Sequence, residues 1–189
     1  QDDIFKIVEP IFYDLCKEFG NGKKINQAPF PRIKYKESLE KYGTDKPDLR
    51  NPIELAEVTK IFKSKDVNLK IFKDLIAKGG IVKAIPVPNT FSKPRSFFDG
   101  LNDWAISEGA SGLAYITFEK VKNKIVGKGP IAKFFSENAI LELIKNCKIT
   151  EKDSVFFVCN KEKEAIRFSG IARQKIAEEL KLIDEKSFH

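Results

Sequence analysis

Four charged side chains are concentrated in the short stretch from Thr44 to Pro52. They are Asp45, Lys46, Asp48 and Arg50. Lysine and arginine are the usual partners of phosphate groups, and carboxylates can orient them. Because this stretch has two prolines and no periodicity, we expect a loop held by specific polar contacts. Two interpretations are open: loops bind ligands more often than their length suggests, but an internally ion-paired turn has the same composition.

A second group of basic side chains lies in an expected hairpin between residues 120 and 128. Its members are Lys120, Lys122, Lys124 and Lys128. Lysines that neutralise phosphates release counterions, so the group is a candidate for contact with an RNA backbone. A hairpin with solvated lysines is the alternative. The net charge of +7 does not decide between them, because only five of the 34 basic residues are arginine, a bias that is also typical of an AT-rich genome.

The residue types needed for self-contained catalysis are scarce. The sequence has no Walker loop, GxSxG, HExxH or GxGxxG motif, and its one histidine is the terminal His189. Three cysteines, Cys16, Cys147 and Cys159, are widely spaced in apolar surroundings and form no CxxC pair. We therefore expect buried thiols, with no metal site and no disulfide.

The first third of the chain must position the charged loop. Apolar residues recur at helical spacing from Ile4 to Phe19, with Asp2 or Asp3 as a cap and Gly20 at the end. Pro10 removes a backbone donor from this helix, so we expect a kink or a late start there. A shorter helix is predicted from Tyr35 to Tyr42, ended by Gly43 directly before the loop.

From Ile53 onwards the spacing predicts short alternating strands and helices. The expected strands are Leu69 to Phe72, Ile81 to Val87, Leu113 to Phe118 and Val155 to Cys159. The expected helices run from near Ser92 to Ser107, closed by Gly109, and from a cap at Ser136 to Cys147. Pro86 and Pro88 place the end of the second strand near a sheet edge.

This pattern predicts an α+β fold in which one sheet is covered by helices on a single face. A long amphipathic helix from Lys161 to Leu182 follows, and we expect it to pair with the first helix around a separately folded middle. The absence of methionine suggests a piece of a longer protein. No apolar run is long enough to span a bilayer and no signal peptide is evident, so we expect a cytoplasmic protein without membrane contact.

Several segments resemble bacterial-type aspartyl-tRNA synthetases of class II. The segment FPRIKYKESLEKYGTDKPDLRNPIEL, Phe30 to Leu55, resembles the part of their catalytic domain that follows motif 2. Three further segments resemble the GAD domain inserted in those enzymes and found in amidotransferase B subunits: GGIVKAIPVP from Gly79, GASGLAYITFE from Gly109 and GPIAKFF from Gly129. The GxxRxK pattern of Gly170, Arg173 and Lys175 is similar to their helix that re-enters the catalytic domain.

The resemblance implies three parts: a catalytic-domain segment at residues 1–52, a GAD domain at residues 53–158 and a returning helix at residues 159–189. It implies a DCoH-like GAD fold, with an antiparallel sheet and helices on one face, flanked by helical pieces of the catalytic domain. In this family the whole enzyme activates aspartate with ATP and Mg²⁺ and transfers it to tRNA-Asp; whether tRNA-Asn is also charged stays open. A homodimeric parent enzyme is also implied.

The resemblance places the principal catalytic motifs outside residues 1–189, so we expect no catalytic residue, ATP site or metal site in this segment. Within it, we expect Lys46 and Arg50 to contact tRNA phosphates while Asp45 and Asp48 orient them. The alternative is the tRNA-binding GAD module of an amidotransferase B subunit, and the synthetase-like segment from Phe30 to Leu55 argues against it. A third interpretation makes the middle domain a spacer or a docking surface.

Overall fold

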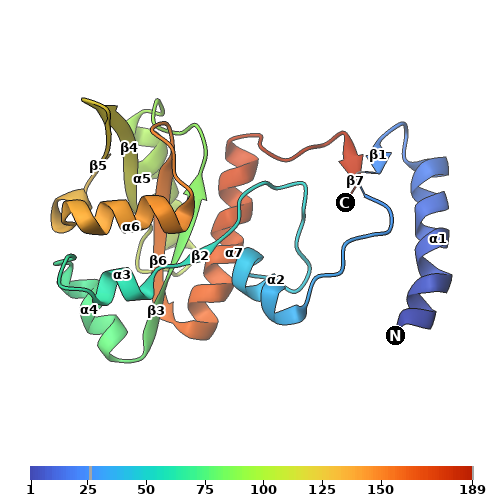
Figure 1. Cartoon of the computed structure of the whole chain (residues 1–189), viewed down its shortest axis with the longest axis horizontal. Helices are drawn as coiled ribbons and strands as arrows, with labels where there is room; N and C mark the ends of the chain where they lie inside the picture. Colours follow the sequence, from blue (N-terminus) through green and yellow to red (C-terminus); the bar gives the residue numbers. More distant parts are fainter. Residues whose placement is uncertain (26, 189) are drawn as a thin grey trace.

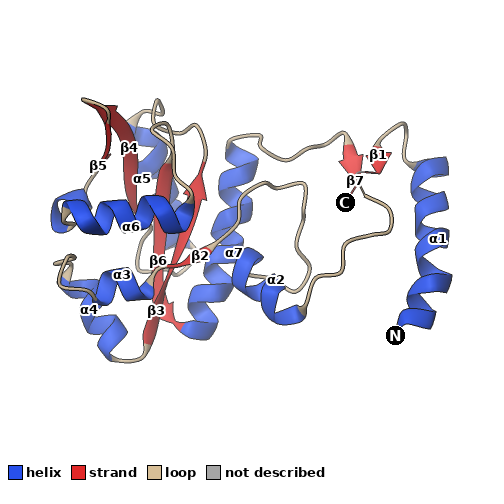
Figure 2. Cartoon of the chain, in the orientation of Figure 1, coloured by secondary structure: helices blue, strands red, loops and turns tan. Residues whose placement is uncertain are grey.

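A five-stranded antiparallel sheet forms the centre of the computed structural model, which describes residues 1–25 and 27–188 (Figure 1). Its order is β2-β3-β6-β4-β5. The strands are β2 (Ala56–Glu57), β3 (Gly80–Val87), β4 (Ala114–Val121), β5 (Lys124–Lys128) and β6 (Ser154–Lys161). The expected strand and helix content of an α+β protein is confirmed, and Figure 2 shows both kinds of element interleaved along the chain.

The central strand β6 shows why the sheet is covered on both faces. It pairs along its whole length with β3, from Gly80 opposite Lys161 to Val87 opposite Ser154, and on its other side with β4. Successive side chains of a strand point to opposite faces. In β6 the side chains from Val155 to Val158 are all buried, so both faces are apolar and both need a covering layer.

Helices α3 (Thr59–Lys63), α4 (Lys70–Ala77) and α6 (Glu137–Cys147) cover one face, where Phe62 packs against Phe72, Phe135 and Phe157. Helices α5 (Arg95–Ser107) and α7 (Glu162–Glu179) contribute to the core on the other face. The expectation of helices on a single face is therefore wrong. The almost wholly apolar strand β6 was the signal that two layers were needed.

Two expected elements differ from the structure for local reasons. The strand expected from Leu69 to Phe72 is instead the start of α4, because Phe72 and Ile76 face the core at helical spacing while Ile71 is exposed. The helix α5 begins at Arg95, since Pro94 takes the extended conformation of its N-cap with φ −65° and ψ 156°. The other predicted strands and helices of the middle part are present, with ends shifted by a few residues.

Turn and cap chemistry in the middle part follows the sequence closely. Ser136 caps α6, where its side chain accepts a hydrogen bond from the backbone N–H of Ala139 at 3.2 Å. Lys122 and Asn123 form the two-residue turn of the β4–β5 hairpin, with φ values of 45° and 64°. Positive φ at both positions suits the twist of a tight hairpin. The short 3-10 helix η1 (Ala132–Phe134) connects β5 to α6.

The first helix, α1 (Asp2–Phe19), lies apart from the sheet, at the opposite end of the molecule in Figure 1. It has no buried residue and continues through Pro10, so the expected late start is wrong, and Gln1 occupies the N-cap position expected for Asp2 or Asp3. The expected pairing of α1 with α7 is also wrong, because α7 packs on β3 and β6 instead. A small parallel sheet of β1 (Lys24–Ile25) and β7 (Ser187–Phe188) joins the two ends of the chain.

Among the described residues, no helix combines the length and apolar character needed to span a bilayer.

Candidate functional site

The charged loop starts at a close contact between two glycines. Helix α2 (Tyr35–Tyr42) ends at Gly43, which takes the left-handed conformation with φ 72° and donates its N–H to the carbonyl oxygen of Leu39. Gly43 lies against Gly170 of α7. A Cβ atom on Gly170 would be 2.6 Å from the oxygen of Gly43, and one on Gly43 would be 2.5 Å from the nitrogen of Gly170. The loop from Thr44 to Pro52 therefore begins directly on the surface of α7.

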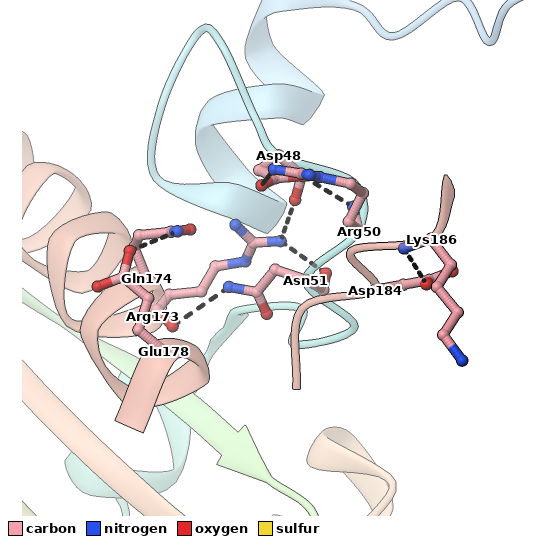
Figure 3. A network of polar contacts seen from close by, with 8 residues as sticks. All are labelled: Asp48, Arg50, Asn51, Arg173, Gln174, Glu178, Asp184 and Lys186. Atoms are coloured by element: carbon pink, nitrogen blue, oxygen red, sulfur yellow. Dashed lines mark hydrogen bonds and ion pairs between the residues drawn. The ribbon is translucent and has the colours of Figure 1, made fainter. Parts of the chain in front are cut away.

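Arg173 of α7 binds the inner side of this loop (Figure 3). Its side chain is buried, with a relative exposure of 2%. Nε donates to the carbonyl oxygen of Ile53 at 2.6 Å, and a terminal nitrogen donates to the carbonyl oxygens of Asp48 at 3.1 Å and Asn51 at 2.9 Å. One guanidinium thus satisfies three backbone acceptors of a segment that has no regular structure of its own.

Two further side chains complete the surroundings of Arg173. The ring of Tyr42 lies 5.0 Å from the guanidinium carbon, within the range of a cation–π contact. Asn51 donates to the carbonyl oxygen of Arg173 at 3.3 Å and accepts from the N–H of Ile53 at 3.0 Å. Burial lowers the pKa of Arg173, while Tyr42 and Asp48 act in the opposite direction. Arginine is basic enough to stay charged at neutral pH, so this is a buried cation held mainly by carbonyl oxygens.

The structure pairs two of the four predicted loop residues. The carboxylate of Asp48 accepts from Nε of Arg50 at 2.9 Å, from a terminal nitrogen of Arg50 at 2.7 Å and from the backbone N–H of Arg50 at 3.0 Å. The side-chain hydrogen bond to Arg50 holds the pKa of Asp48 below its ordinary value. This bidentate geometry fixes the plane of the Arg50 guanidinium, whose side chain stays one-third exposed.

The other two predicted residues extend into solvent. Lys46 is 89% exposed, and its Nζ approaches the carboxylate of Asp45 only to 4.0 Å. Lys46 and Asp48 line a cavity of about 610 Å³ between the loop, α5 and α7, whereas Asp45 and Arg50 are not among its lining residues. The four charges therefore do not converge on one point, and Lys46 is the most accessible cation of the loop.

The lysines of the β4–β5 hairpin are spread over its surface. Lys124 pairs with Glu137 of α6 at 2.8 Å, and Lys128 pairs with Glu119 at 2.5 Å. Lys120 and Lys122 are exposed, and the described part of the chain provides no ion-pair partner for either. Two of the four positive charges are thus already balanced by carboxylates, which weakens this hairpin as an anion-binding surface compared with the loop.

All three cysteines were expected to be buried, and the structure buries one of them, Cys147. Burial raises the pKa of the Cys147 thiol to about 12 and that of Cys159 to about 11, so both are uncharged thiols at neutral pH. Cys16 of α1 and Cys159 of β6 are only partly covered, so the expected burial of these two thiols is wrong. His189, the one histidine of the sequence, lies outside the described residues.

Two buried cations were not recognised as site residues from the sequence. Arg173 falls on the same helical stripe as Ala165, Ala172 and Ile176, which all face the core, and an arginine in such a stripe signals a buried polar partner. Lys83 interrupts the apolar run of β3; its Nζ donates to the carbonyl oxygen of Glu40 in α2 at 2.8 Å, and burial lowers its pKa. In both cases the signal was a charge inside an apolar pattern.

A family model described as GAD domain matches residues 72–168. This range is just over half of the chain, and it contains β3, α5, the β4–β5 hairpin, α6, β6 and the first part of α7. The chain belongs to the GAD domain family. Arg173 lies just beyond the matched range, so the guanidinium joins the end of the GAD domain to the loop at Thr44–Pro52.

The similarity to known proteins extends well beyond the GAD domain. A protein of Beijerinckia indica named "Aspartate--tRNA(Asp/Asn) ligase" is 48% identical over 96% of this chain, and the proteins of the same name from Pelagibacter ubique and Rickettsia bellii are each 47% identical over 100% of it. This chain spans only about 30% of the length of these relatives. The segments before and after the GAD domain are therefore also shared with proteins of that name.

Proposed function

We propose that this chain is a segment of an aspartate–tRNA ligase, whose whole protein activates aspartate with ATP and esterifies it to tRNA-Asp. The observation that supports this proposal is the similarity over 96% to 100% of the chain to proteins named "Aspartate--tRNA(Asp/Asn) ligase". A GAD module from an amidotransferase B subunit is less well supported, because the matched relatives share the flanking segments as well as residues 72–168. Charging of tRNA-Asn as a second substrate is part of the relatives' name and is a further proposal for this chain.

Within that ligase we propose the division into residues 1–52 and 159–189 as parts of the catalytic domain and residues 53–158 as the GAD insertion. The exposed apolar face of α1 supports the placement of residues 1–52 in a larger domain: Ile7, Phe12 and Phe19 are each more than half exposed. An amphipathic helix with no buried residue has an apolar face that needs a partner. The remainder of the ligase would supply that partner. The whole ligase would be a cytoplasmic homodimer.

The loop is the proposed tRNA-proximal surface of this segment. Lys46 extends into solvent, and the side-chain hydrogen bonds of Arg50 to Asp48 use its Nε and one terminal nitrogen. Lys46 and the other terminal nitrogen of Arg50 would therefore contact the phosphates of a tRNA. Asp45 and Asp48 would orient these cations. Lys120 and Lys122 of the hairpin are a weaker second candidate for contact with the RNA backbone, since Lys124 and Lys128 are paired with carboxylates.

The double substitution Lys46→Ala and Arg50→Ala in the full-length ligase tests this role. We expect the KM for tRNA to rise by about tenfold or more, because two phosphate contacts are lost. Adenylate formation, measured by aspartate-dependent ATP–pyrophosphate exchange, should stay unchanged. A matched control is Lys36→Ala with Arg95→Ala, which removes one exposed lysine and one exposed arginine away from the loop. Unchanged tRNA affinity and charging in the Lys46/Arg50 variant would exclude the proposed contact.

ATP and Mg²⁺ are the expected cofactors of the whole ligase. Among the described residues, no group of three or more His, Cys, Asp or Glu side chains is placed to hold a metal ion. We propose that the remainder of the ligase binds both cofactors and supplies the catalytic residues, as the resemblance implies.

A further inference from the structure

Two buried cations attach the α2–loop segment to the sheet. Lys83 reaches from β3 to the carbonyl oxygen of Glu40 in the last turn of α2, where the negative end of the helix dipole favours a positive charge. Arg173 reaches from α7 to the carbonyl oxygens of Asp48 and Asn51 in the loop that follows and of Ile53 just after it. Figure 1 shows α7 between the sheet and α2, so the helix packs on the sheet with one side and holds the loop with the other.

The contacts of Arg173 select one conformation of the loop. Hydrogen bonds donated by a charged group are about twice as strong as neutral ones, and three carbonyl oxygens must point inward together to receive them. Between Gly43 and Ile53 the chain has no helix or strand, so individual contacts hold this segment. Besides those of Arg173, Ser38 donates to the carbonyl oxygen of Thr44, and the N–H of Asp184 donates to that of Arg50. Without the guanidinium, the three carbonyl groups that Arg173 binds would turn towards water.

A short chain of contacts leads from Arg173 to the outer surface of the loop. The guanidinium of Arg173 binds the backbone oxygen of Asp48, and the side chain of Asp48 binds Arg50 in a bidentate arrangement (Figure 3). The position of the Asp48 backbone, together with the hydrogen bond from the N–H of Asp184 to the carbonyl oxygen of Arg50 at 3.2 Å, therefore determines where the Arg50 guanidinium is presented. Arg173 itself is buried and has no access to a ligand on the surface.

We propose that Arg173 is a positioning residue for tRNA: it fixes the loop so that Arg50 and Lys46 are presented to the tRNA phosphates, without touching the tRNA itself. This inference rests on the proposed role of the loop. The GAD domain would then help to position the loop in the ligase, because the helix that carries Arg173 is packed on the GAD sheet.

The test uses the full-length ligase with Arg173→Met, Arg173→Lys and the control Arg95→Met, which changes an exposed arginine of α5. We expect Arg173→Met to raise the KM for tRNA by about tenfold to a hundredfold, since a misplacement of about 1 Å has effects of this size. Arg173→Lys keeps the charge and part of the hydrogen bonding, so its KM should fall between the wild type and Arg173→Met. Aspartate-dependent ATP–pyrophosphate exchange should stay within about twofold of wild type in all variants.

A second measurement reports on the loop directly. Hydrogen exchange of the backbone amides of Arg50 and Ile53, which donate to side chains within the loop, should become faster in Arg173→Met while the exchange of β6 is unchanged. If Arg173→Met does not fold, the positioning role is tested on Arg173→Lys by the same two measurements. An unchanged KM for tRNA in the folded variants, or an equal loss of pyrophosphate exchange and charging, would overturn the positioning role.

The outcomes separate this inference from the proposed tRNA contact. If the Lys46→Ala and Arg50→Ala substitutions raise the KM for tRNA and those at Arg173 do not, the loop contacts tRNA but Arg173 does not position it. If neither set of substitutions changes this KM, the tRNA contact itself is excluded, and the positioning role is excluded with it.

Discussion

At the scale of single residues, the loop is organised by two arginines in different environments. Arg173 is buried and bound by carbonyl oxygens, whereas Arg50 is partly exposed and bound by the carboxylate of Asp48. Removal of a buried hydrogen-bonded cation leaves several acceptors unsatisfied, but an exposed pair contributes little to stability. Arg173 is thus suited to hold structure, and Arg50 is suited to bind a ligand.

The Asp48–Arg50 pair predicts a modest dependence of stability on pH. The hydrogen bond from Arg50 lowers the pKa of Asp48 from its ordinary value of 3.8, so the native state favours the carboxylate. Its stabilisation is fully present above pH 3.8 and is lost as the pH falls through the lower native pKa. We expect Asp48→Asn to lower the free energy of unfolding at pH 7 by about 1 kcal/mol or less, measured by urea denaturation, and the difference from wild type to shrink well below pH 3.8.

Asp45→Asn is the control for this prediction, because the carboxylate of Asp45 is more than half exposed and approaches Lys46 only to 4.0 Å. Its unfolding free energy at pH 7 should match that of wild type within about 0.5 kcal/mol. An equal loss of stability in both variants would show that the net charge of the loop, rather than the pair with Arg50, is responsible.

At the scale of elements, α7 connects the sheet to the loop through small and buried residues. Its Ala165, Phe168 and Ile176 pack in the core beside the sheet, while Gly170 allows the backbone of Gly43 to come close. The same helix thus carries an apolar stripe, a glycine contact and a buried arginine. Its position relative to the loop is fixed at two points, one backbone contact and one guanidinium.

A glycine-to-alanine substitution should have opposite effects on the unfolding free energy at Gly170, which contacts Gly43, and at Gly100, which has open space around it. Gly170→Ala would place a Cβ atom 2.6 Å from the oxygen of Gly43, so the loop must shift, and we expect a loss of about 1–3 kcal/mol in unfolding free energy. In Gly100→Ala of α5 the new Cβ atom meets nothing within 4 Å, and a gain of about 0.5–1 kcal/mol is expected from the better helix former. Thermal or urea unfolding of the two variants checks the pair, and a stabilised Gly170→Ala would contradict the close contact.

At the scale of the whole molecule, the chain has a well-packed sheet unit and an N-terminal helix without buried residues. The two cores lie on opposite faces of one sheet, and they bury most of the large apolar side chains. The largest group of exposed apolar side chains in one described element is on α1, which also lies apart from the sheet in Figure 1. This asymmetry agrees with a segment that forms part of a larger catalytic domain, as proposed above.

The exposed face of α1 predicts a difference between this chain and the full-length ligase. The double substitution Ile7→Glu and Ile11→Glu should change the unfolding free energy of the 189-residue chain by no more than about 0.5 kcal/mol, because neither side chain is buried. Phe62→Ala, the positive control in the core, should cost about 3–5 kcal/mol. The full-length ligase should lose stability on the α1 substitutions, and an unchanged full-length protein would contradict a covered α1 face.

Local chemistry in the sequence was sufficient for much of the fold. The hairpin turn, the Ser136 cap, the short helix ended by Gly43 and the irregular loop were all predicted, because each depends on the conformational preferences of a few adjacent residues. The resemblance to bacterial-type aspartyl-tRNA synthetases was likewise recognised from contiguous residues such as Phe30 to Leu55. The short, mostly apolar run from Leu69 to Phe72 was predicted as a strand, but the packing of its side chains against the core made it the start of a helix.

The sequence by itself determined the α+β class and the position of the charged loop, since these follow from residue types and their spacing. The family was indicated by the resemblance of contiguous segments. The tertiary structure alone decided that helices cover both faces of the sheet, that α1 stays uncovered and that Asp48 pairs with Arg50 while Lys46 extends into solvent. It also showed that Arg173, more than a hundred residues after the loop, binds its carbonyl oxygens. Such contacts depend on which distant segments meet in space, and periodicity along the chain does not specify this.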